Sequence, residues 1–340
     1  MKKSILLIMI GLFSLHLIAQ TKEYYENGQL RSIGEYKDEK KTGEWKEYHE
    51  NGKLYKVENW FNGEETGQWK EYVNNGRLYG LGICFKDISG NSFIRWEYYY
   101  INGGIQKTGT KVAGKEVGEW KIYHKNGQLN EIGNYENGLR TGKWKSFTEE
   151  GTLLIVSNYE NNLLNGERKS YWDYDTGQLM SERTYKKGFK IGLSKKFYSN
   201  GQLEAIGTYN NNGNPTGEWK EYYENGQIFR IKNWLNGKAS GEWKEYYENG
   251  LLRGVTNSKN GLETGISEWY FDNGQLQLKL VRFENKLMDI ISLFDKNGNI
   301  LDKGTLVNGN GTFNFYNEDG VYTHSEEFVN GEKVISHKKE

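Results

Sequence analysis

Hydrophobic and polar positions follow a unit that recurs about every 24 residues along this chain. The best-preserved copies read GEWKEYYENGQ at 217–227 and GEWKEYYENGL at 241–251. A typical copy holds a Trp, an aromatic residue three positions later and an Asn-Gly pair, followed by an aliphatic residue and usually by a large aromatic one. Short apolar runs bounded by Gly and Asn predict strands joined by tight turns. We therefore expect two strands of roughly five to eight residues in each unit.

Thirteen turn glycines mark the copies, and ten of them follow an Asn. They are Gly28, Gly52, Gly76, Gly103, Gly127, Gly151, Gly177, Gly201, Gly226, Gly250, Gly274, Gly298 and Gly320. Asn-Gly between apolar runs predicts a hairpin with a type I′ turn, because both central residues of that turn need a positive φ. A second turn follows in many copies, as at Asn62-Gly63 and Asn236-Gly237. So many turns exclude helices from most of the chain. We expect an all-β fold, an elongated repeat array of antiparallel β-hairpins.

The Trp and the following aromatic residue are three positions apart, which strict strand alternation places on opposite faces of the sheet. Either both faces carry aromatic side chains, or a β-bulge brings them to one face. We favour the first alternative, which suggests a sheet of a single layer rather than two packed layers.

The first residues have the layout of an export signal. Lys2 and Lys3 precede a mostly apolar run from Ile5 to Ile18, and the small residue Ala19 follows. We predict a signal peptide at 1–20, cleaved at or just after Ala19 or Gln20, and an exported mature chain in the periplasm, the cell envelope or the medium. An uncleaved membrane anchor is the alternative, although the run is short for a bilayer. We assign 21–288 to tandem repeats and 289–340 to degenerate C-terminal repeats or a cap.

Composition narrows the partners. Basic and acidic residues balance at 45 each, which offers no basic patch for nucleic acid. No segment after the signal is apolar enough to cross a membrane, so we expect no transmembrane span in the mature chain. Cys84 is the single cysteine and cannot form an intramolecular disulfide.

These units resemble the bacterial MORN-repeat-variant family, whose unit is similar to the G-x-W-x-x-Y-x-x-N-G-x-L … Y-x-N-G-x-x-x-G seen here. The resemblance covers essentially Lys22 to Lys333. It implies a meander of hairpins and no chemistry. Many chains of the family carry the label of a YwqK-type antitoxin, and eukaryotic relatives are membrane-associated scaffolds. A cytosolic toxin would be out of reach of an exported chain, so an immunity-like or adhesive role fits better.

The chain departs from the family pattern in three places. The unit between Gly76 and Gly118 is stretched, Arg168 stands at a Trp position, and the pattern fades beyond Leu278. The last stretch is interpreted as a polar cap, which repeat arrays need to stay soluble.

No constellation of catalytic residues stands out. The five histidines include no pair at metal-ligand spacing, and the recurring Glu and Lys positions form a lattice rather than a unique acid–base pair. We interpret Cys84 as a small buried hydrophobe, because it takes a repeat position that is otherwise aromatic. We therefore predict a protein that is not an enzyme, with no catalytic residue, no metal and no cofactor.

The aromatic ladder is the feature with functional reach, because exposed apolar patches mark interaction sites. Its structural alternative is that cross-strand aromatic pairs only stabilise the sheet. The candidate partner-binding surface comprises Trp45, Tyr48, Trp69, Tyr72, Trp120, Tyr123, Trp144, Trp219, Tyr222, Trp243 and Tyr246. We expect a scaffold that binds another protein. Binding of a glycan or cell-wall polymer through the ladder and contact with a membrane or lipid are the alternatives.

Overall fold

The computed structural model describes residues 18–172 and 177–338, and its regular secondary structure in these residues consists of β-strands. The predicted all-β array of antiparallel hairpins is confirmed. No helix in those residues is long and apolar enough to cross a membrane. The chain divides into two compact units: Met1–Thr141 with Glu149–Gly151, and Gly142–Thr148 with Thr152–Glu340.

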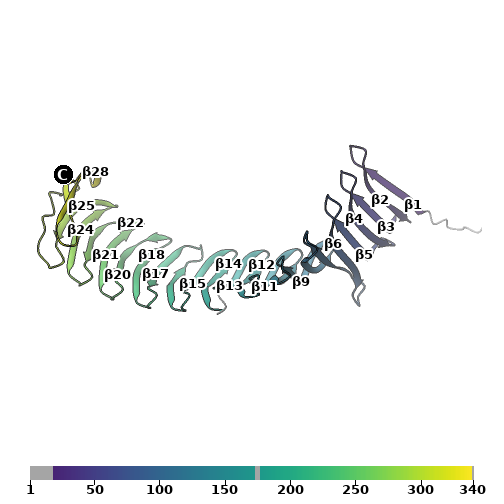
Figure 1. Ribbon diagram of the computed structural model, residues 1–340, viewed down its shortest axis with the longest axis horizontal. Coiled ribbons are helices and arrows are strands. Elements are labelled where there is room, and N and C mark those ends of the chain that lie inside the picture. The colour runs from purple at the N-terminus through teal and green to yellow at the C-terminus, as the bar shows by residue number, and fades with distance from the viewer. Residues whose placement is uncertain (1–17, 173–176, 339–340) are drawn as a thin grey trace, which may run out of the picture. The chain divides into compact units, whose positions relative to one another are not determined.

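In the first unit each strand pairs antiparallel with the next one along the chain, so neighbours in sequence are neighbours in the sheet (Figure 1). Its strands are β1 (Ile18–Tyr24), β2 (Leu30–Lys37), β3 (Lys40–Tyr48), β4 (Leu54–Phe61), β5 (Glu64–Tyr72), β6 (Leu78–Lys86), β7 (Ser92–Tyr99), β8 (Ile105–Val112), β9 (Lys115–Tyr123) and β10 (Leu129–Glu136).

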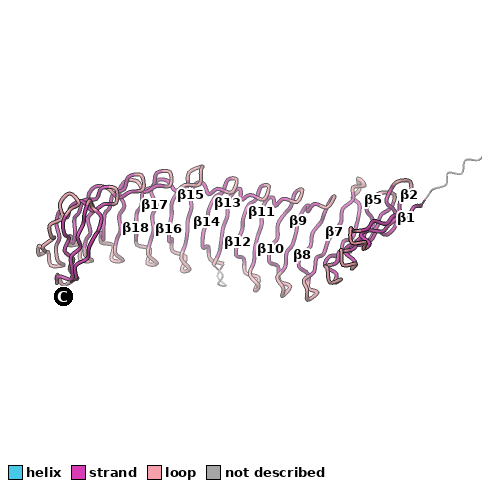
Figure 2. The backbone as a smooth tube through the Cα atoms, turned by 90° about the horizontal axis from the view of Figure 1, so that it is seen from above, coloured by secondary structure: helices cyan, strands magenta, loops and turns pink. Residues whose placement is uncertain are grey.

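The second unit continues the same plan, with turns along both edges of the strands (Figure 2). Its repeat strands are β11 (Leu139–Phe147), β12 (Leu153–Glu160), β13 (Leu163–Tyr171), β14 (Leu179–Lys186), β15 (Phe189–Phe197), β16 (Leu203–Tyr209), β17 (Pro215–Tyr222), β18 (Ile228–Leu235), β19 (Lys238–Ala239), β20 (Gly241–Tyr246), β21 (Leu252–Lys259), β22 (Leu262–Glu263), β23 (Gly265–Tyr270), β24 (Leu276–Phe283) and β25 (Lys286–Leu293).

A second, three-stranded sheet closes the C-terminal end, with β26 (Gly311–Tyr316), β27 (Tyr322–Val329) and β28 (Glu332–Lys338). Phe313 and Phe328 of this sheet, and Leu306 just before it, are buried together with four apolar residues of β24 and β25. The chain around this sheet also bonds to β25, since Gly309 N donates to Met288 O and Leu287 N to Gly331 O. The last repeat strand is therefore covered, as an edge strand needs to be. The predicted boundary at 288/289 falls inside β25.

The Asn-Gly turns near the Trp and Tyr positions are not of the predicted type. In the copy around Gly226, only the glycine has a positive φ, of 85°, and the loop closes through Tyr223 N donating to Gln227 O at 2.8 Å. This is a three-residue loop that ends on a left-handed glycine. The Asn keeps an ordinary backbone because its side chain accepts a bond from Gln227 N at 2.9 Å. Second turns of the Asn-Gly kind, such as that at Asn236 and Gly237 with φ of 49° and 83°, are type I′.

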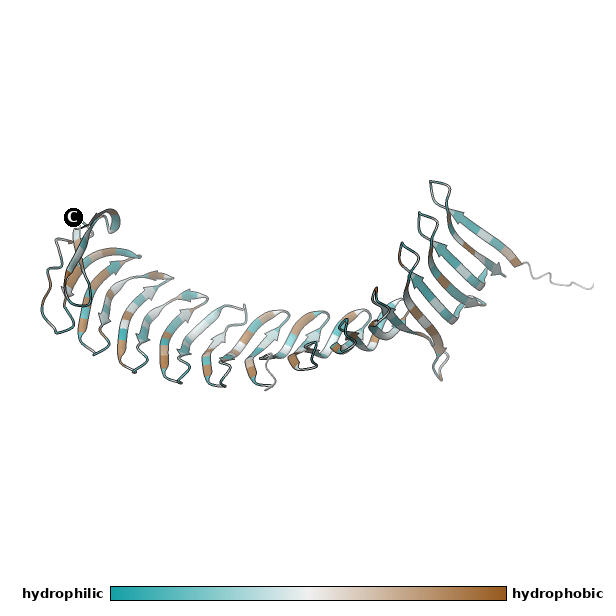
Figure 3. Cartoon of the chain, viewed as in Figure 1, coloured by the Kyte–Doolittle hydropathy of each residue, from teal (hydrophilic) through white to brown (hydrophobic). Residues whose placement is uncertain are grey.

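Both faces of the repeat sheets carry aromatic side chains, as favoured from the sequence. In β7, Trp96 and Tyr98 are buried in one apolar cluster. Glu97 and Tyr99 alternate with them along the strand and so lie on the other face, where the Tyr99 hydroxyl donates to the Glu97 carboxylate. Bulges do occur, for example where Tyr48 pairs with Leu54 while Glu47 pairs with Lys56. The skipped residue belongs to the neighbouring strand, so side chains alternate regularly from Trp45 to Tyr48. We call the face of Trp45, Trp120 and Trp219 the tryptophan face, and the face of Tyr48, Tyr123 and Tyr222 the tyrosine face. Figure 3 shows hydrophobic and hydrophilic bands along the strands.

The predicted signal peptide at 1–20 lies outside the described residues except for its end. Ile18, Ala19 and Gln20 begin β1 and pair with Lys37, Tyr36 and Glu35 of β2. A cut after Ala19 or Gln20 would leave the rest of β1 paired, and cleavage stays a prediction.

Candidate functional site

Four tryptophans of the predicted surface are buried. Trp45, Trp69, Trp120 and Trp144 have between 1% and 6% of their side-chain surface exposed. The copies around Trp45 and Trp120 explain how a single-layer sheet buries an indole, because each ring lies directly on a glycine of the preceding strand. The half-buried Trp219 lies on a glycine in the same way. A Cβ atom on Gly109 would stand 2.1 Å from Cδ2 of Trp120, and one on Gly207 would stand 1.9 Å from Cδ2 of Trp219.

The same indoles are held by hydrogen bonds and aromatic contacts. Trp120 Nε1 donates to Thr110 O at 3.2 Å, and Trp243 Nε1 donates to Asn233 O at 3.1 Å. Tyr36 packs edge-on against Trp45, with 5.1 Å between ring centroids. These contacts tie each strand pair to the next, so the recurrence of Trp has a structural reason.

Trp219 and Trp243 are only half-buried. In the two copies before Trp219 the Trp position is filled by Arg168 and Ser194, which provide no further ring to pack against. In this stretch the Ser170 and Ser181 side chains are buried, and their hydroxyls are hydrogen-bonded to each other at 2.6 Å. The sequence-predicted tryptophan surface is therefore open only at Trp219 and Trp243, while the other four side chains belong to the interior.

The five tyrosines of the predicted surface lie on the opposite face. Tyr48, Tyr72, Tyr123, Tyr222 and Tyr246 are half-buried, and among the described residues no hydrogen bond involves their hydroxyls. Residues in line with them are charged in balanced pairs: Lys220 Nζ lies 3.0 Å from Glu218, and Lys244 Nζ lies 2.6 Å from Glu242. The structure thus divides the predicted surface into a largely buried tryptophan set and an accessible tyrosine set.

A second tyrosine position, which sequence reasoning did not single out, links successive copies. Tyr223 Oη donates to Tyr246 O at 2.7 Å, and Tyr25, Tyr100, Tyr198 and Tyr247 make the equivalent bond to the copy that follows. The signal was present as the second Tyr of the EYYENG runs. The hydroxyl of Tyr223 and the carbonyl of Tyr246 are 23 residues apart and meet only when the sheet forms, so the bond could not be inferred from the sequence.

Because the Tyr223 hydroxyl is hydrogen-bonded and the Tyr222 hydroxyl is not, substitution of these neighbours by Phe should affect stability differently. Tyr223→Phe removes the bond to Tyr246 O and should lower the free energy of unfolding by about 0.5–1.5 kcal/mol. Tyr222→Phe, which removes a hydroxyl without a bond, should stay within roughly 0.5 kcal/mol of the parent. Denaturant titration of the two variants measures both. An equal loss for Tyr222→Phe would show that its hydroxyl is also bonded.

Cys84, Glu71 and Lys107 are partly buried ionisable residues of the first unit. Its Sγ donates to Glu65 O at 3.2 Å, and burial raises the pKa of the thiol, which lowers its reactivity. Burial also raises the pKa of the Glu71 carboxyl and lowers that of Lys107. Within residues 18–172 and 177–338, no group of three or more His, Cys, Asp or Glu side chains is arranged to hold a metal ion.

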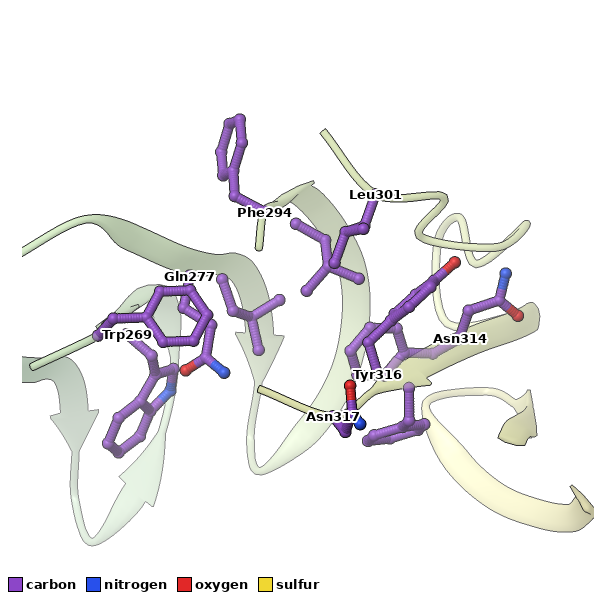
Figure 4. Close-up of a pocket in the computed structure, with 12 residues that line it drawn as sticks. Trp269, Gln277, Phe294, Leu301, Asn314, Tyr316 and Asn317 are labelled. Carbon is purple, nitrogen blue, oxygen red and sulfur yellow. The ribbon is translucent and has the colours of Figure 1, made fainter. Parts of the chain in front are cut away.

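A cavity of the second unit lies between the last repeat strands and the C-terminal sheet. Its volume is about 280 Å³. It is lined by Trp269 and Phe271 at the end of β23, Gln277 and Leu278 of β24, Leu293, Phe294 and Leu301 after them, and Phe313, Asn314, Phe315, Tyr316 and Asn317 of β26 and its turn. In Figure 4, Trp269 and Gln277 lie on one side and Leu301, Asn314 and Tyr316 on the other. No sequence pattern predicted this cavity, because it falls where the repeat pattern fades.

Comparison with known proteins identifies the repeat. The model of the MORN repeat variant family matches nine segments, which together cover more than half of the chain: 19–38, 41–62, 116–137, 140–161, 164–187, 190–211, 215–236, 239–260 and 263–285. No curated protein sequence matches.

Among solved structures, the crystal structure of TcdB2-TccC3-TEV aligns at 12% identity with a TM-score of 0.18. A Tc holotoxin pore of Photorhabdus luminescens aligns at 13% identity with a TM-score of 0.19. Each alignment covers 95% of this chain and 23% of the other, so the chain spans less than a quarter of those proteins.

Proposed function

We propose, from the premise that this chain belongs to the MORN repeat variant family, that it is an exported scaffold, not an enzyme, which binds another protein through its tyrosine face. The observation that carries the proposal is the division of the aromatic residues between the two faces. Four of the six predicted tryptophans are buried within the sheet, and only Trp219 and Trp243 are half-buried. All five tyrosines of the opposite face keep half-exposed rings, and their hydroxyls make no hydrogen bond in the described part of the chain.

Tyrosine is suited to this task. It supplies a rigid ring and a polar hydroxyl at a low cost in side-chain entropy, and it is enriched among the residues that anchor protein interfaces. Tyr222 and Tyr246 occupy the same position in neighbouring copies, two strands apart, so their rings repeat at roughly 10 Å. Lys220 and Lys244 beside them are paired with Glu218 and Glu242, which favours aromatic and polar contact over charge steering.

Glycan binding and lipid contact, the two alternative functions, have less structural support. Stacking of a glycan on an indole needs an open ring face, and only Trp219 and Trp243 of the predicted tryptophans keep part of theirs. The balanced charge of 45 basic and 45 acidic residues gives no polybasic patch for a lipid surface. An immunity-like role against a toxin would be one form of protein binding.

The proposal of export rests on the sequence of the first 20 residues. The Lys2-Lys3, apolar run and Ala19 layout should lead to a mature N-terminus at Gln20 or Thr21. N-terminal sequencing of the protein recovered from the cell envelope or the medium tests this. Recovery of a chain that still begins with Met1 would contradict it.

Partner binding is tested by capture with the mature chain as bait on native envelope material. Once the captured protein is identified, its affinity is measured for two double variants. Tyr222→Ser with Tyr246→Ser should weaken binding by roughly 30-fold or more, since each interface anchor contributes about 1 kcal/mol or more. The matched control is Glu221→Gln with Glu245→Gln, one residue away on the tryptophan face, and it should bind like the parent. Equal weakening by both pairs would contradict the assignment of the face.

A further inference from the structure

The cavity beside the C-terminal sheet has the character of a ligand site rather than a packing gap. At about 280 Å³ it exceeds the roughly 150 Å³ that holds a benzene molecule in an engineered apolar cavity, and it approaches the lower end of natural small-molecule pockets. Phe271, Leu293 and Phe313 form its buried part, with 8%, 8% and 6% of their surface exposed. Trp269, Phe294 and Tyr316 are half-exposed around them.

The lining is uncharged. Its twelve residues comprise six aromatic side chains, three leucines and the amides of Gln277, Asn314 and Asn317. An ionised ligand would lose its hydration there without gaining an opposite charge. A flat, uncharged ring can instead stack on the aromatic side chains, and its apolar surface leaves water.

Some polar groups at the rim of the cavity are hydrogen-bonded within the chain, and others can bond to a ligand. Tyr316 Oη donates to Asp302 O at 2.8 Å and Asn314 Nδ2 to Asp302 Oδ2 at 3.1 Å, so both side chains are held in place by their own chain. The Gln277 side-chain amide and the Trp269 indole N–H have no hydrogen bond to any residue in the described part of the chain. A ligand with one hydrogen-bonding group would satisfy at least one of them.

We infer that this cavity binds an uncharged ring compound of one or two rings that carries a hydrogen-bonding group, of the indole or phenol type. The same chemistry is available from a free small molecule and from a Trp or Tyr side chain of a peptide. The inference is independent of the proposed tyrosine-face interaction, because Trp269 and Leu278 pair in register on the opposite, tryptophan face.

The experiment titrates the full mature chain with indole and follows binding by calorimetry. Saturable one-to-one binding is expected, with a dissociation constant at or below roughly 1 mM, the range of ring-sized fragments. Indole-3-carboxylate, the charged analogue, should bind about tenfold more weakly or worse, because its carboxylate has no partner in the cavity. N-acetyltryptophanamide separates the sources: binding as tight as that of indole assigns a peptide side chain, and weaker binding assigns a free molecule.

Two variants locate the site. Leu301→Trp fills the cavity from its half-exposed rim and should abolish binding. Gln277→Leu keeps the volume similar and should weaken indole binding by roughly fivefold to tenfold while leaving toluene binding unchanged, since only the hydrogen bond is lost. Gln128→Leu, in the first unit, is the matched control and should bind like the parent.

Hydrogen exchange of β24 to β27 checks that each variant keeps its C-terminal sheet. Absence of saturable binding in the parent would overturn the inference. So would unchanged binding in a folded Leu301→Trp or Gln277→Leu variant.

Discussion

Replacing Trp120 with alanine is expected to lower the free energy of unfolding of the first unit by about 3–5 kcal/mol. Trp120 is the most deeply buried of the tryptophans, with 1% of its surface exposed, and it shares an apolar cluster with Trp69, Ile94, Trp96 and Tyr98. Loss of the indole leaves a cavity between strands that have no second layer to collapse onto it. Denaturant titration followed by fluorescence of the remaining tryptophans measures the change.

Gly109 provides the control for that result, since Trp120 lies on it. Gly109→Ala introduces a Cβ atom where the ring now stands, 2.1 Å from Cδ2, and should cost about 1–3 kcal/mol or more by overpacking. In a chain that already carries Trp120→Ala, the same substitution should cost much less. A double-mutant cycle with no coupling between the two positions would show that the indole does not rest on this glycine.

Leu306→Ala is expected to lower the stability of the C-terminal sheet by about 2–5 kcal/mol. Leu306 is 2% exposed and packs into the cluster that joins β24 and β25 to the three-stranded sheet. Loss of that contact weakens the cover over β25, the last strand of the repeat sheet. Hydrogen exchange should report faster exchange in β24 to β28, with β1 to β10 unchanged, because repeat arrays couple mainly between neighbours.

The adjacent Val307 is the matched control for this prediction. It is 58% exposed, and Val307→Ala should stay within roughly 0.5 kcal/mol of the parent. Similar losses for the two substitutions, or faster exchange throughout both units after Leu306→Ala, would contradict the assignment of Leu306 to a local core.

The repeat itself was predictable, since Gly, Asn and the aromatic residues return at nearly constant spacing and local turn chemistry sets the hairpins. Opposite placement of Trp45 and Tyr48 also followed from strand alternation. The turn type was not predictable from Asn-Gly alone. Asn225 uses its side chain to hold Gln227 N, and that bond favours an ordinary backbone at the Asn.

Burial of the tryptophans could not be read from the sequence, because it depends on which residue the neighbouring strand places beneath each ring. Gly109 and Trp120 are eleven positions apart and meet only in the folded sheet. The cavity beside Leu278 and Phe313 could not be predicted either, because its walls include strands outside the regular repeat. Sequence periodicity predicts what recurs, whereas this cavity occurs where recurrence ends.

The central claim, that the tyrosine face is the one that meets a partner, is tested most directly by photo-cross-linking in intact cells. p-Benzoylphenylalanine is placed at position 222 or 246 on the tyrosine face, and at position 221 or 245 on the tryptophan face as the matched control. The account predicts one adduct of defined mass, formed from 222 and 246 and absent from 221 and 245. The same adduct from all four positions, or an adduct from 221 and 245 alone, would contradict it.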